Sequence, residues 1–137
     1  MGRILSIDYG KRRIGLAASD PLGITAQPVG LLQVRSDDEA LREIAKVIEE
    51  REVDEIVIGM PTNMDGTIGP IAETVQAFTE RLREQSGLPV HTYDERLTSA
   101  LAHRLLKAKG VKPSQRKGKL DVMSAQIILQ DFLDSRS

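Results

Sequence analysis

The sequence predicts an α/β domain built on one mixed sheet. Three strand-like apolar segments come first along the chain, and from residue 36 onward helical patterns alternate with short strand patterns. Strands joined through helices are expected to be parallel, because a helix returns the chain to the edge where the previous strand began, and such crossovers are right-handed. The 137 residues are most simply one domain, residues 1–137, large enough to bury a core.

The first three strands are expected to be antiparallel neighbours. Residues 3–8 read as a strand that ends at Asp8, and after a turn residues 14–19 read as the returning strand of a hairpin. A third strand covers residues 26–34, with Pro28 at its start or on an edge, because proline cannot donate to a ladder.

Helices and parallel strands are expected to follow. Ser36 opens a helix whose capping box is completed by Glu39, and the apolar run at residues 55–60 is typical of a strand buried on both faces. The remaining expected elements are a helix from Pro70 to Gly87, a strand over 90–93, a helix from Thr98 or Ser99 to Gly110, and a last helix over 119–133.

Composition excludes several classes of site. The chain has no cysteine, which rules out disulfides, thiolate zinc sites and cysteine nucleophiles and fits a cytoplasmic location. No signal-peptide pattern or membrane-spanning apolar run is found, so no membrane partner is expected. Residues 96–119 contain eight basic side chains and no acid, a pattern that suits a polyanion but also an ordinary solvated helix face.

Carboxylates are predicted to gather at one edge of the sheet. If the first strand is central, its end at Asp8 lies beside the ends of the later parallel strands, where Asp94 and Glu95 follow. Clustered carboxylates repel unless a cation intervenes, and Mg²⁺ or Mn²⁺ prefers oxygen ligands. Asp8 and Glu95 are the first two candidates. Asp94 and Glu95 should face opposite sides, and the sequence leaves open which one takes part.

Asp121 is the third candidate. It shares a helical face with Ala125, Ile128 and Phe132, which is the face expected to pack on the sheet. An acid there is either a metal ligand or a first-turn residue that complements the helix dipole, and spacing alone leaves both readings open.

Two further features could meet a phosphate at this edge. The segment GMPTNMDG, residues 59–66, is a turn between strand and helix or a functional loop whose amides and Asn63 line the site. Arg96 is either a surface charge or a phosphate clamp next to Glu95.

Four motifs together resemble a known family. IDYGKRRIGLA, GMPTNMDGT, DERLTS and KGKLDVMSAQIILQDFL match, in order and spacing, the motifs of the YqgF/RuvX family of RNase H-like nucleases, over nearly the whole chain. The resemblance implies an RNase H-like fold, a five-stranded mixed sheet flanked by helices, with the first three strands antiparallel and the others parallel.

The resemblance also implies metal-dependent hydrolysis of nucleic-acid phosphodiesters. By position, Asp8, Glu95 and Asp121 match the family's three acids, which would be both catalytic and metal-binding with Mg²⁺ or Mn²⁺. The expected nucleic-acid contacts are Arg96, Lys117, Lys119, Lys11 and Asn63. The family is described both as nucleases that mature the 5′ end of 16S rRNA precursor and as Holliday-junction resolvases, so structured RNA and branched DNA are alternative partners.

Two rival readings remain beside the nuclease. An Asp-x-Gly hairpin also opens the phosphate loop of actin-like ATPases, but these enclose a nucleotide between two domains, and this chain supplies one. The second rival is a non-catalytic, RNA-binding assembly factor whose acids are structural. Symmetric junction resolution would need a dimer, whereas trimming a single strand needs one copy, so a monomer or weak homodimer is expected.

Overall fold

The computed structural model describes residues 2–61, 69–94, 105, 108–110 and 117–136. The described strands are β1 (Arg3–Asp8), β2 (Arg13–Ser19), β3 (Ala26–Gln33), β4 (Val53–Met60) and β5 (Val90–Asp94). The described helices are α1 (Asp37–Glu50), α2 (Pro70–Ser86) and α4 (Lys117–Arg136). The predicted helix between Thr98 and Gly110 lies mostly outside the described residues.

The strands form one five-stranded mixed sheet in the order β3-β2-β1-β4-β5. β1 pairs with β2, and β2 with β3, in antiparallel register, whereas β1–β4 and β4–β5 are parallel. The predicted α/β class and the central position of the first strand are confirmed. Because β1 is central, both of its neighbours bring residues to the end of the strand at Asp8.

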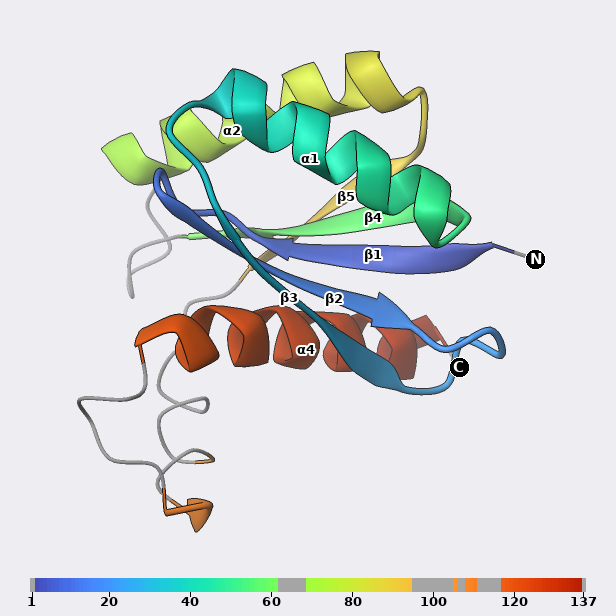
Figure 1. Ribbon diagram of the computed structural model, residues 1–137. Coiled ribbons are helices and arrows are strands. Elements are labelled where there is room, and N and C mark those ends of the chain that lie inside the picture. Colours follow the sequence, from blue (N-terminus) through green and yellow to red (C-terminus); the bar gives the residue numbers. More distant parts are fainter. Residues whose placement is uncertain (1, 62–68, 95–104, 106–107, 111–116, 137) are drawn as a thin grey trace.

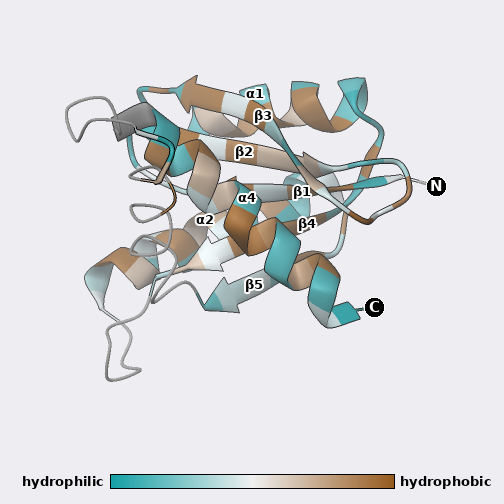
Figure 2. Cartoon of the chain, turned by 90° about the horizontal axis from the view of Figure 1, so that it is seen from below, coloured by the Kyte–Doolittle hydropathy of each residue, from teal (hydrophilic) through white to brown (hydrophobic). Residues whose placement is uncertain are grey.

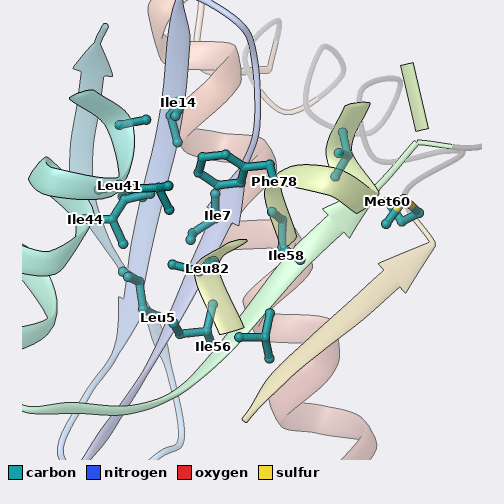
Figure 3. Close-up of a cluster of buried hydrophobic side chains, with 14 of the residues drawn as sticks. Leu5, Ile7, Ile14, Leu41, Ile44, Ile56, Ile58, Met60, Phe78 and Leu82 are labelled. Carbon is teal, nitrogen blue, oxygen red and sulfur yellow. The ribbon is translucent and has the colours of Figure 1, made fainter. Parts of the chain in front are cut away.

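Helices cover both faces of the sheet (Figure 1). α1 and α2 lie over one face and α4 over the other. Between the sheet and the first two helices lies the larger core, which gathers side chains of β1, β4, α1 and α2 (Figure 3): Leu5, Ile7, Ile56, Ile58, Leu41, Ile44, Phe78 and Leu82. The core under α4 is smaller and includes Ala17, Val57, Ala125, Ile128 and Leu129. α4 crosses this face of the sheet (Figure 2).

Local sequence signals place the helix ends well. The Ser36 side chain accepts a hydrogen bond from the Glu39 amide, so the N-cap predicted for α1 is present. Pro70 begins α2, and Gly87 ends it in the left-handed conformation with φ 68°. Three elements extend beyond the bounds predicted from the sequence. β4 begins at Val53, β5 reaches Asp94, and α4 runs from Lys117 to Arg136.

No helix in the described part of the chain is both long and apolar enough to cross a bilayer. A buried polar side chain under α4 is paired with the helix backbone. The buried Ser6 hydroxyl donates to the carbonyl oxygen of Ala125 at 2.8 Å, which joins the central strand to the middle of α4.

Candidate active site

Asp8 is the last residue of the central strand and is half-buried. Side chains alternate along a strand, so Asp8 shares its face with Ser6, whose hydroxyl bonds to α4. Leu5 and Ile7 point to the opposite face and enter the core beneath α1 and α2. The Asp8 carboxylate therefore lies at the carboxyl end of β1 on the side of the sheet that α4 covers.

Gly15 is the residue that brings α4 to Asp8. It is the antiparallel partner of Asp8 across β1 and β2, and such directly opposed residues have side chains on the same face. A Cβ at Gly15 would lie 2.0 Å from the backbone oxygen of Asp121 and 2.8 Å from the amide nitrogen of Val122. The helix backbone thus occupies the space of the missing side chain, which places the start of α4 beside the end of β1.

Asp121 makes an ion pair with Arg13 in this region. Arg13 Nε lies 3.0 Å from Asp121 Oδ2, and the two side chains are 31% and 21% exposed. The Oδ2 atom itself is buried. A buried carboxylate oxygen needs a compensating cation, and the guanidinium of Arg13 supplies one from the first residue of β2.

The helix-dipole reading of Asp121 is wrong. It assumed that Asp121 lies in the first turn of a helix beginning near Lys119, but α4 begins at Lys117 and its first turn contains no acid. The dipole effect falls off within that first turn. Packing over Gly15 and pairing with Arg13, rather than capping, account for the placement of Asp121.

The other predicted site residues divide into two groups. Glu95, Arg96 and Asn63 lie outside the described residues. The second group consists of lysines that the structure describes. Lys117 is the first residue of α4, Lys119 is exposed two residues later in the same helix, and Lys11 is exposed between β1 and β2.

Asp94 faces away from α4. It is the register partner of Met60, whose side chain enters the core under α1 and α2, and it is exposed. Its neighbour Tyr93 packs on the α4 side. Strand alternation therefore separates Asp94 from the face that holds Asp8 and Asp121. Among the described residues, no three histidine, aspartate or glutamate side chains are grouped closely enough to hold a metal ion.

Tyr9 connects the end of β1 to the first turn of α1. Its hydroxyl donates to Asp37 Oδ1 at 2.7 Å, and its ring centroid lies 4.6 Å from that of Phe78. Burial, helped by the hydrogen bond and the charge of Asp37, raises the pKa of Tyr9 well above its ordinary value. The hydroxyl therefore stays protonated and holds the residue after Asp8 in place.

A broad groove of about 890 Å³ opens next to Asp121. Basic residues of the β1–β2 connection and of the segment after β3 line it: Lys11, Arg12, Arg13 and Arg35, with Gly10, Gln33, Val34, Glu39 and Asp121. Sequence reasoning selected only Lys11 from these cations. The basic run KRR directly after Asp8 could have signalled Arg12 and Arg13, whereas Arg35 becomes a neighbour only through strand pairing.

The chain matches known proteins over nearly its full length. A family model described as RuvX, Holliday junction resolvase, matches residues 2–135. A protein from Roseiflexus sp. named "Putative pre-16S rRNA nuclease" is 42% identical over 98% of this chain and 96% of its own length. A protein of the same name from Ruminiclostridium cellulolyticum is 45% identical over 96% and 94%.

Two solved structures show the same fold at low sequence identity. The chain resembles T. thermophilus RuvC in complex with a Holliday junction substrate, with a TM-score of 0.64 at 12% identity over 99% of this chain and 96% of that one. It also resembles the fowlpox virus Holliday junction resolvase, with a TM-score of 0.57 at 15% identity over 98% and 99%. The predicted RNase H-like architecture is confirmed by these likenesses.

Proposed function

Because this chain belongs to the RuvX family of nucleases, which hydrolyse phosphodiester bonds, we propose that it trims the 5′ end of 16S rRNA precursor in a metal-dependent reaction. The name shared by the full-length relatives supports the RNA substrate. The observation that carries the proposed site is the contact between α4 and Gly15, since it brings the Asp121 backbone against the register partner of Asp8.

We propose Asp8, Glu95 and Asp121 as the catalytic and metal-binding acids. The two described members fit a hard cation: both are carboxylates, both are partly removed from water, and Asp121 Oδ2 is a buried oxygen. We propose Glu95 rather than Asp94 as the third acid, and the position of Asp94 on the face of β5 that Met60 shares supports this choice.

Mg²⁺ or Mn²⁺ bound there would activate a water molecule and stabilise the leaving oxygen. The protein's own part is positioning. The β1 ladder holds Asp8, the Gly15 contact and the Ser6 hydrogen bond hold α4, and α4 holds Asp121. Fixed carboxylates lower the reorganisation needed at the moment of reaction.

Basic side chains would position the substrate. We propose that Lys117, Lys119, Lys11, Arg96 and Asn63 contact phosphates on either side of the scissile bond, where contacts orient the strand without reading its sequence. A single strand end requires only one copy of the site, so the protein acts as a monomer or weak homodimer. We place this activity in the cytoplasm, where a 16S precursor is found.

The test is a side-by-side cleavage assay on a 16S precursor 5′ fragment and a four-way DNA junction, with Mn²⁺, Mg²⁺ or chelator. We expect metal-dependent cleavage of the RNA fragment and a loss of about a hundredfold or more in Asp8→Asn, since even residues that only support metal ligands cost 10–100-fold. Asp38→Asn is the matched control, because Asp38 is exposed on α1 and bonds only to Arg81 among the described partners.

Metal binding is checked separately from activity. Mn²⁺ should raise the Tm of the wild type in a concentration-dependent manner and leave that of Asp8→Asn nearly unchanged. A folded Asp8→Asn variant that cleaves as well as the wild type would show that the site is wrong. Cleavage of the junction with no cleavage of the RNA fragment would show that the substrate is wrong.

A further inference from the structure

The groove beside Asp121 is strongly basic in a chain that is not. Four of its lining side chains are cationic, namely Lys11, Arg12, Arg13 and Arg35, against two acids, Glu39 and Asp121, while the whole chain has a formal net charge of −1. We call this surface the arginine groove. A local concentration of positive charge in a hollow raises the attraction for anions above that of a flat surface.

Most of these cations are available to a ligand. Lys11, Arg12 and Arg35 are exposed, and none of them forms an ion pair with a described residue, whereas Arg13 lies against Asp121. Holding exposed cations together without partners costs repulsion energy that a polyanion would relieve. The alternative is that these side chains are ordinary solvated surface charges. Their position around one groove, rather than scattered over the surface, favours a shared ligand.

The backbone of the arginine groove is fixed by the sheet. The Val34 amide donates to the Arg12 carbonyl oxygen at 2.9 Å, and Arg13 is the register partner of Gln33. The turn after β1 and the segment after β3 are therefore held side by side by ladder hydrogen bonds. Cationic residues on a backbone that is already ordered bind a nucleic-acid backbone with a smaller entropy cost than residues on mobile loops do.

The arginine groove is continuous with the proposed cleavage site. Asp121 is one of its lining residues, and Gly10 and Lys11, which also line it, follow Asp8 closely in the chain. A strand with one phosphate near Asp8 and Asp121 that follows this groove would pass Arg12 and Arg35, which line it. Guanidinium groups suit this contact, because their planar donors match phosphate oxygens in pairs.

We propose that the arginine groove binds the phosphate backbone of the nucleic-acid strand on one side of the scissile phosphate, with Arg12 and Arg35 as its main contacts. This inference rests on the proposed function. Arg13 joins the groove to the site, since it holds Asp121 and lines the groove at once. Glu39 is the groove's one acid outside the proposed site, and it opposes binding.

The test measures binding rather than cleavage. All variants are made in the Asp8→Asn background, and fluorescein-labelled oligo(U) is titrated at several salt concentrations. Arg12→Ala with Arg35→Ala should weaken binding roughly tenfold and reduce the slope of log K against log salt by about 1.4, that is about 0.7 for each lost phosphate contact on a single strand. Glu39→Gln should tighten binding roughly twofold to threefold.

Matched controls lie on α1. Lys46 and Glu49 are exposed there and outside the groove, so Lys46→Ala and Glu49→Gln should leave affinity and salt slope unchanged. Circular dichroism confirms folding, which exposed positions such as Arg12 and Arg35 are not expected to disturb.

The outcomes separate this inference from the proposed function. If the arginine variants bind oligo(U) as well as their parent, or if Lys46→Ala weakens binding equally, the arginine groove is not the binding surface, even when wild-type protein cleaves RNA. If the variants lose affinity while the wild type cleaves neither substrate, the groove stands and the proposed reaction fails.

Discussion

Gly15→Ala is the substitution that tests the architecture of the site most directly. The new Cβ would lie 2.0 Å from the Asp121 carbonyl oxygen, 2.3 Å from the Asp121 carbonyl carbon and 2.8 Å from the Val122 nitrogen. All three are backbone atoms of α4, so no change of side-chain rotamer relieves the contact. The helix start has to withdraw by about 1 Å before the closest distance exceeds 3.0 Å.

That withdrawal has a calculable cost. One methyl group forced into a packed contact typically destabilises a protein by about 1–3 kcal/mol. In a chain of this length, each kcal/mol lowers Tm by roughly 4 °C. The strain falls on the start of α4, because the middle of the helix is held by the Ser6 hydrogen bond and the buried side chains of Ile128 and Leu129.

The functional effect should exceed the effect on stability. A shift of about 1 Å in a catalytic group can cost roughly a hundredfold in rate. We therefore expect the Gly15→Ala variant to have lost most of its cleavage activity on the 16S fragment, even at assay temperatures well below the Tm of the variant. The control is Ile44→Val, which removes a methylene from the opposite core, costs about 0.5–1.5 kcal/mol and leaves α4 in place.

The assays are urea unfolding, thermal melting and cleavage of the 16S fragment below Tm. If Gly15→Ala has the Tm and the urea midpoint of the wild type, α4 does not pack on Gly15 as described, and the reasoning fails. If it is destabilised as expected but cleaves normally, the position of Asp121 is not important for the reaction.

Two further predictions concern α4 and its contacts. Ser6→Ala removes the buried hydrogen bond to Ala125 and should lower the free energy of unfolding, measured in urea, by about 1 kcal/mol. The control Ser135→Ala removes an exposed hydrogen bond to Phe132 and should change that free energy little. Equal effects of the two substitutions would contradict this prediction. Burial, followed by the hydrogen bond to Asp131 and nearby acidic charges, raises the pKa of Tyr93 to about 12. The protonated Tyr93 hydroxyl therefore contributes stability below the ordinary tyrosine pKa near 10, and this contribution is lost as the pH rises toward 12. Tyr93→Phe should make the urea midpoint fall less steeply over that alkaline range, and an unchanged slope would refute this coupling.

Sequence reasoning worked best where a structural feature depends on neighbours in the chain. The strand ending at Asp8, the cap at Ser36 and the stop at Gly87 were predicted and are confirmed. Each follows from a local cause: an apolar alternation, a side chain that reaches the next amides, or a residue that tolerates positive φ.

It failed where a feature depends on distant segments. Spacing left two readings of Asp121 open, and the first-turn reading is removed only by the structure, in which α4 begins at Lys117 and has no acid in its first turn. Gly15 was read only as part of a strand, and Arg35 was not selected at all. Their importance comes from the pairing of Gly15 with Asp8 and of Arg13 with Gln33, which no local pattern encodes.

By itself the sequence determined the order of the described strands and helices, the family, and Asp8 at the end of the first strand, because these follow from local side-chain chemistry and motif spacing. The tertiary structure alone decided that α4 lies against Gly15, that Asp121 meets Arg13 rather than capping a helix, and that four cations share one groove. Close packing is the reason: which backbone can fill the space above a missing side chain depends on the whole sheet and the helix it carries.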